Sequence, residues 1–145
     1  MVFLVQLAIA TAGEFTITNQ TILHQSLPNG LDVIWIDDGN PEIDLYTVYA
    51  VGSYMDSKPH QAHMTEHAMF CTNDGAYDDL VTKYAEATNA YTRNEHTTYY
   101  TVNITRENFQ TVLDYEFRRM TELEVDEECF EYEYARLERE VEDNH

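Results

Sequence analysis

Hydrophobic and polar positions divide the chain into an early part with a two-residue period and a later part with a helical period. Residues 31–37 (LDVIWID) and 43–51 (IDLYTVYAV) are rich in β-branched and aromatic residues, which predicts two strands. Turn signals flank them at 28–30 (PNG) and 38–42 (DGNPE). Residues 15–27 alternate enough to predict a further strand or hairpin arm.

From Pro59 onward the pattern changes to a helical period. Pro59 itself suits the first turn of a helix, where its missing N–H costs little. The pattern predicts one strand at 97–104 and four helices, at 59–70, 77–87, 106–123 and 127–144, the last two capped by Thr105 and Asp126. The order β–β–α–α–β–α–α predicts an α+β domain in which helices lie against a mainly antiparallel sheet.

The first twelve residues, 1–12, are apolar and end in Ala10-Thr11-Ala12, the small-x-small pattern of a signal-peptide cleavage site. A signal peptide predicts a secreted or periplasmic protein whose mature domain is 13–145. The alternative is that this segment is the first strand of the domain. No run of 18 apolar residues predicts a membrane span. No strand is predicted after the last helix, so we expect the domain to be incomplete at its C-terminal end.

Composition excludes some partners. The chain carries 27 acidic and 8 basic residues, for a formal net charge of -19. This balance argues against nucleic acid and against anionic membrane surfaces. Cys71 and Cys129 could form one disulfide, but their spacing does not decide whether they do.

The segment HMTEH, residues 63–67, carries the candidate chemistry. Positions four apart share one face of a helix, so His63 and His67 could present both imidazoles to one Zn²⁺. Glu66 lies beside that face and could act as the general base for a zinc-bound water. The pattern H-x-x-E-H reverses the commoner H-E-x-x-H. A five-residue pattern also occurs by chance, so a third ligand is needed to support a zinc site.

The last predicted helix offers candidates for that third ligand. Apolar residues at helical spacing mark its buried face: Phe130, Tyr134, Leu137 and Val141. Glu133 and Glu140 fall together on one flank of this face. Glu138 and His145 fall on the other flank, and two acids point further away, Glu131 and Glu142. Helix geometry leaves both flanks open, and for Glu131, Glu138 and Glu142 a solvated surface is the alternative interpretation.

Five blocks of the sequence, in order, resemble the insulinase/pitrilysin metallopeptidases, a family that includes the mitochondrial processing peptidases. The blocks are LPNGLDVI, VGSYMD, AHMTEHAMFCTND, TNAYTRNEHTTYYT and FEYEYARLERE. The resemblance implies the family's half-domain fold and a zinc-dependent metalloendopeptidase. It also implies a peptide substrate, and a second homologous half or partner subunit, because the family's enzymes are built from two similar halves. The alternative is a non-catalytic or partner-dependent subunit of the same fold.

The resemblance also implies roles for single residues. Glu140 would be the third zinc ligand, and Glu133, seven residues earlier, its acidic neighbour. A competing register pairs Glu138 with His145 and makes His145 the ligand. The family's substrate-binding edge strand would be Asn89, Ala90, Tyr91 and Thr92. The chain departs from the family where Asp56 replaces a Glu, Cys71 a basic residue and Tyr134 an Arg.

Overall fold

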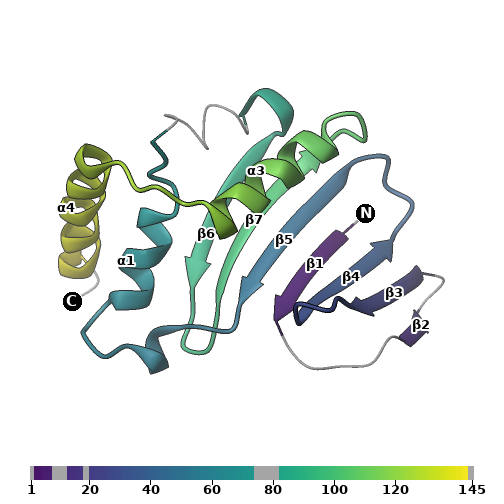
Figure 1. Cartoon of the computed structure of the whole chain (residues 1–145), viewed down its shortest axis with the longest axis horizontal. Coiled ribbons are helices and arrows are strands. Elements are labelled where there is room, and N and C mark those ends of the chain that lie inside the picture. Colours follow the sequence, from purple (N-terminus) through teal and green to yellow (C-terminus); the bar gives the residue numbers. More distant parts are fainter. Residues whose placement is uncertain (1, 8–12, 18–19, 74–81, 144–145) are drawn as a thin grey trace.

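A single seven-stranded sheet organises the chain, and the computed structural model describes residues 2–7, 13–17, 20–73 and 82–143 of it. Helix α3 crosses one face of the sheet, while α1 and α4 lie side by side beyond one edge (Figure 1). The strands are β1 (Val2–Leu7), β2 (Gly13–Ile17), β3 (Gln20–Ser26), β4 (Leu31–Asp37), β5 (Ile43–Tyr49), β6 (Ala87–Thr92) and β7 (Thr97–Ile104). The helices are η1 (Ser53–Met55), α1 (Gln61–Ala68), α3 (Phe109–Thr121) and α4 (Glu127–Asp143).

The strand order is β2-β3-β4-β1-β5-β7-β6, so β6 ends the sheet on the side of α1. Neighbouring strands pair antiparallel, except for the parallel pair β1 and β5. The predicted α+β class with a mainly antiparallel sheet is therefore confirmed. The segment Val2–Leu7 forms a strand between β4 and β5, which is the alternative to a signal peptide. Cleavage after residue 12 would remove that strand, and the signal peptide stays a prediction.

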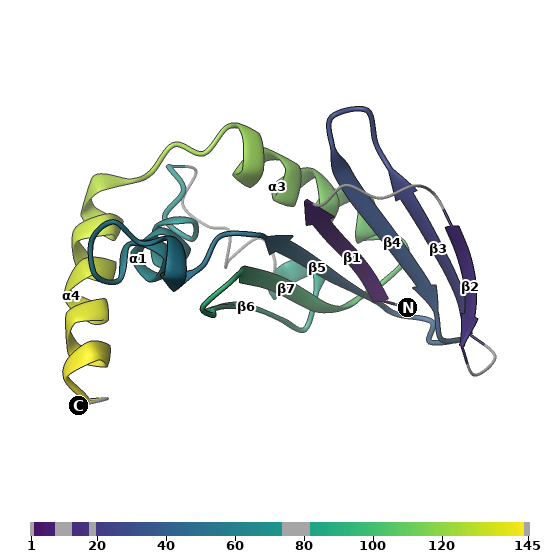
Figure 2. The same cartoon turned by 90° about the horizontal axis from the view of Figure 1, so that it is seen from below.

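The hydrophobic core lies between the sheet and α3, which Figure 2 shows along one face of the strands. Alternate residues of β5 point into it, as expected from the period of a strand. Ile43, Leu45, Ile104 and Val112 form its buried centre, and Trp35 and Phe109 pack against them. Trp35 and Phe109 meet edge to face with ring centroids 6.4 Å apart. Burial of these side chains fixes α3 and the central strands, from which the elements of the site extend.

The helices predicted at 59–70 and 106–123 are shorter in the structure, where they are α1 (Gln61–Ala68) and α3 (Phe109–Thr121). Helix α3 begins at Phe109, because the carbonyl of Thr105 accepts the N–H groups of Asn108 and Phe109 in a preceding turn. The Thr105 cap was therefore wrong, whereas Asp126 caps α4 by accepting the N–H of Cys129 at 2.8 Å. Much of the predicted helix 77–87 lies outside the described residues. Its last residue, Ala87, instead begins β6 and pairs with Val102.

No helix in the described parts of the chain combines the length and the apolar character needed to cross a membrane. Cys71 and Cys129 form a disulfide, which sequence spacing left undecided.

Candidate metal centre

Helix α1 is held at its start by the segment that precedes it. The N–H of Ala62 donates to Asp56 Oδ1 at 2.8 Å, which satisfies one of the donors that a helix start leaves unpaired. His60 adopts a left-handed conformation, with φ 61°, and its carbonyl accepts the N–H of Met64 at 2.8 Å. The helix then places His63 and His67 one turn apart, with ring centroids 4.9 Å apart.

Helix α4 packs mainly against α1 and brings its carboxylates to these histidines. Glu140 Oε2 lies 3.6 Å from the Nε2 atoms of both His63 and His67, which are themselves 3.2 Å apart. A tetrahedral Zn²⁺ with ligands about 2.0–2.1 Å away keeps those ligands roughly 3.3 Å from one another. The three atoms thus form a triangle of the size that Zn²⁺ requires, and both types of donor group, imidazole nitrogen and carboxylate oxygen, bind zinc.

Glu133 contacts the ring nitrogen of His67 that does not belong to this triangle. Its Oε2 lies 2.6 Å from Nδ1 of His67, which is 7% exposed. A carboxylate can only accept, so Nδ1 carries the hydrogen and Nε2 presents its lone pair toward Glu140 and His63. Burial, reinforced by the neighbouring His67, lowers the pKa of His63 below its ordinary value. A lowered pKa favours the neutral imidazole, which is the form that binds metals.

Glu66 precedes His67 in α1 and is 8% exposed. Thr92 Oγ1, on β6, donates a hydrogen bond to Glu66 Oε2 at 2.5 Å. The sequence placed Thr92 among the predicted substrate contacts and gave no sign of this bond.

Arg136 was also missed by the sequence analysis: its Nε lies 3.2 Å from Glu140 Oε1 and its Nη1 3.4 Å from Glu133 Oε2. The i,i+3 and i,i+4 spacing to these two acids was the signal that could have found it.

A cavity of about 520 Å³ joins these groups to the edge strand β6. Its walls include the three candidate ligands, Glu66, Glu133, Arg136 and Phe70, together with Thr88 and the four residues predicted to contact substrate, Asn89, Ala90, Tyr91 and Thr92. The elements therefore bring a ligand triangle, a buried carboxylate and a sheet edge to one open space.

The match to known proteins covers these same elements. Residues 43–145 match the insulinase family (peptidase family M16), well over half of the chain. The chain belongs to the insulinase family of peptidases. A comparison with curated proteins finds no match to the sequence.

In this insulinase-family domain the two flanks of α4 face different surroundings. Glu133 and Glu140 line the cavity with the histidines. Glu138 is exposed and lines a separate groove with Met64 and Ala68, away from the ligand triangle. Its partner in the competing register, His145, lies outside the described residues. Glu131 and Glu142 are exposed, as expected for solvated acids.

Proposed function

We propose that this domain is the catalytic part of a zinc-dependent metalloendopeptidase. One observation carries the proposal: the Nε2 atoms of His63 and His67 and Oε2 of Glu140 form a triangle with sides of 3.2, 3.6 and 3.6 Å. The chain belongs to a family of peptidases, which supports peptide-bond hydrolysis as the reaction of a metal bound at this triangle. In the proposal, His63, His67 and Glu140 hold Zn²⁺, and Glu133 orients His67 through Nδ1.

Glu66 is the general base of the proposed reaction. When bound, Zn²⁺ supplies Lewis acidity, which polarises the scissile carbonyl and acidifies water. Glu66 takes the proton from the attacking water and later gives it to the leaving amine. Because Thr92 donates to Oε2 of Glu66, Oε1 is the oxygen left for this proton transfer.

Strand β6 is the proposed site for the peptide substrate. It ends the sheet, and its one described strand neighbour is β7. An extended peptide could add to its outer edge through backbone hydrogen bonds. Because Asn89, Ala90, Tyr91 and Thr92 line the cavity, such a peptide would pass beside the ligand triangle and Glu66.

A Glu66→Gln variant tests the proposed reaction. The amide keeps the size of the side chain and loses the basic oxygen, so cleavage of an unstructured peptide should fall by roughly 10²–10⁴-fold. Zinc content should stay that of the wild type, because Glu66 does not belong to the ligand triangle. Glu131→Gln, at an exposed position of α4, is the control and should change neither quantity. Unchanged cleavage in Glu66→Gln would overturn the proposed role of this residue.

The alternative is a non-catalytic or partner-dependent subunit of this fold. Cleavage by the wild-type chain, measured alone and with a second insulinase-type half, distinguishes it from the proposed enzyme. A wild-type chain that holds zinc and cleaves peptides only after addition of a second insulinase-type half would be partner-dependent. A chain that never cleaves would be a binding subunit.

A secreted or periplasmic location stays a prediction, and the disulfide is in keeping with it, because disulfides persist in oxidising compartments.

A further inference from the structure

A covalent link and the candidate ligand cluster both join the helices α1 and α4. Cys71, just beyond α1, is 1% exposed and is bonded to Cys129 in the first turn of α4, with the Cα atoms 5.5 Å apart. The N–H of Asp126 donates to the carbonyl of Cys71 at 2.9 Å beside this bridge. At the other end, His63 lies in the first turn of α1 and Glu140 in the last turn of α4. The helices therefore run antiparallel: the disulfide joins the end of α1 to the start of α4, and Glu140, in the last turn of α4, reaches both histidines of α1.

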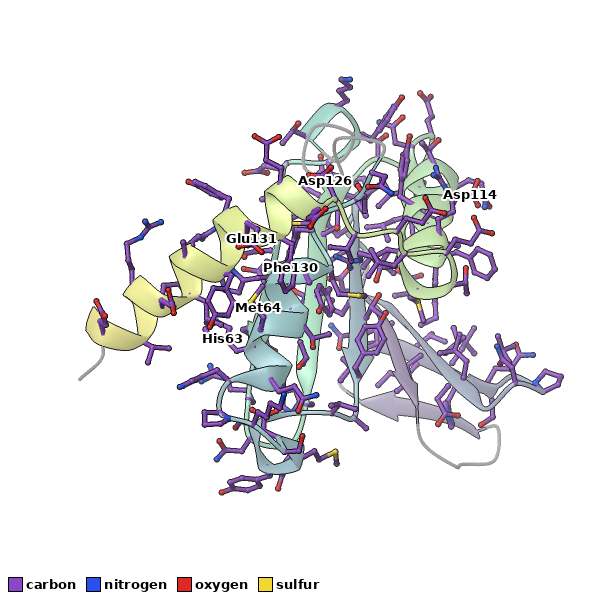
Figure 3. The ribbon with its side chains drawn as sticks, turned by 60° about the vertical axis from the view of Figure 1, so that its left-hand side comes forward. His63, Met64, Asp114, Asp126, Phe130 and Glu131 are labelled. Atoms are coloured by element: carbon purple, nitrogen blue, oxygen red, sulfur yellow. A yellow bond between two sulfur atoms is a disulfide. The ribbon has the colours of Figure 1, made fainter. Side chains whose placement is uncertain are left out.

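Apolar packing between the two helices is sparse. Leu137 is the one buried side chain among the described residues of α4, at 5% exposed. An open groove of about 1020 Å³ runs along one flank of the pair, lined by Met64, Ala68 and Phe130 among others. Figure 3 shows Met64 and Phe130 at this junction. Because little apolar surface is buried here, the position of α4 depends on a few polar contacts, among them that of Glu133 with His67, and on the disulfide.

The disulfide restricts where Glu140 can lie. Glu140 follows Cys129 along one continuous helix, so the two are separated by roughly 16 Å at 1.5 Å per residue. Fixing the first turn of a rigid helix limits the positions that its last turn can reach. Without the bridge, α4 would have to lose more orientational freedom when Glu140 joins the histidines around a metal ion.

We propose that the Cys71–Cys129 disulfide is a positioning element of the metal centre, and that its presence raises the affinity of the folded domain for Zn²⁺. The inference rests on the ligand set of the proposed function. Coupling between two sites is reciprocal, so bound Zn²⁺ and the disulfide each stabilise the arrangement that the other requires.

The test compares the disulfide-bonded wild type with the double variant Cys71→Ala/Cys129→Ala, which introduces no free thiol that could bind zinc. Each metal-free protein is titrated with Zn²⁺ against a chromogenic chelator. The double variant should bind Zn²⁺ more weakly by roughly 5- to 150-fold, the usual range of coupling between sites. Zinc should also raise the melting temperature of the wild type by more than that of the variant.

A control separates positioning from general loss of stability. Val112→Ala creates a cavity in the core beneath α3, remote from both helices, and should destabilise the fold while leaving the zinc affinity of the folded protein unchanged. Equal affinity in the double variant and the wild type would overturn the proposal. If the double variant loses helicity, circular dichroism during the zinc titration decides: recovery of helix at higher zinc concentration supports the coupling, and no recovery overturns it. Zinc binding without peptide cleavage, even after addition of a second insulinase-type half, would instead defeat the proposed enzyme and leave this coupling intact.

Discussion

The hydrogen bond between Thr92 and Glu66 sets the orientation of the proposed base. A carboxylate has no hydrogen to give, so Thr92 must donate its one hydroxyl hydrogen to Oε2 of Glu66. Thr97 Oγ1 donates to the carbonyl of Val51 at 2.9 Å and lies 3.4 Å from Thr92 Oγ1. The hydroxyl hydrogen of Thr97 is therefore already used, and Thr92 keeps its own hydrogen for Glu66.

Thr92→Val should lower kcat by roughly 10–100-fold, the usual effect of removing a group that orients a functional side chain. Valine keeps the shape and removes the donor, so zinc affinity and KM should change little. Thr92→Ser should restore most of the rate. Thr88→Val is the matched control, because Thr88 lies on the same strand and lines the same cavity but donates to the carbonyl of Tyr100. A similar loss in both valine variants would show a general effect on β6, not positioning of Glu66.

For single residues, the sequence predicts those positions that depend only on the geometry of one helix. The spacing of His63, Glu66 and His67 follows from one helical turn, and the structure brings both histidines to one point. The choice between Glu140 and His145 does not follow from helix geometry, because it depends on which flank of α4 meets α1. The bond from Thr92 joins residues 26 positions apart, and no local pattern announces such a contact.

Gly52 shows how one position fixes several elements relative to one another. Its φ is −148°, an extended conformation that any residue adopts, so conformational freedom is not the reason for glycine here. A Cβ would lie 2.2 Å from the carbonyl oxygen of Arg93 and 2.6 Å from the N of His96. The N–H of Ser53 donates to that carbonyl at 3.0 Å. The absence of a side chain thus lets the chain before α1 approach the turn that follows β6.

Gly52→Ala should therefore lower the free energy of unfolding by about 1–3 kcal/mol, as expected for overpacking against backbone atoms. Urea denaturation measures this directly. Gly39→Ala is an informative contrast: Gly39 has φ +80° and no atom within 4 Å of the place that an added methyl group would take, so its cost comes from backbone strain alone. Zinc affinity should fall in the first variant and not in the second, because Gly39 lies in a turn remote from α1. An unperturbed Gly52→Ala protein would contradict this role of Gly52 in the framework of the site.

Elements are predicted well where they bury a regular face. Strands β4, β5 and β7 follow their hydrophobic patterns, and the Asp126 cap gives the start of α4. Strand β6 was missed by pattern, because an edge strand with the sequence ATNAYT alternates between exposed and half-buried and carries little apolar signal. The family resemblance supplied it instead. Long-range pairing with β7 makes this segment a strand.

For the whole molecule, the antiparallel α+β plan could be predicted from element order, but the position of residues 2–7 could not. A short apolar segment suits both a signal peptide and an inner strand, and its pairing with β4 and β5 is a long-range contact that no local pattern indicates. The helix pair α1 and α4 stands beyond the last strand, joined to the sheet through the turn at Gly52 and through β6 (Figure 1). The site is thus built where the helix pair meets the edge strand β6, which no single element reveals.

The most direct test of the proposed metal centre is the zinc content of the whole chain. With 27 acidic residues, weak zinc binding at the surface is expected, so the comparison must use a variant of equal charge. Wild type, Glu140→Gln and Glu138→Gln would be purified, dialysed and analysed for bound metal. We expect about one zinc per chain in the wild type and in Glu138→Gln, and a sharp loss in Glu140→Gln, since catalytic zinc needs three protein ligands. Zinc retained by Glu140→Gln, or absent from the wild type, would contradict the proposed metal centre.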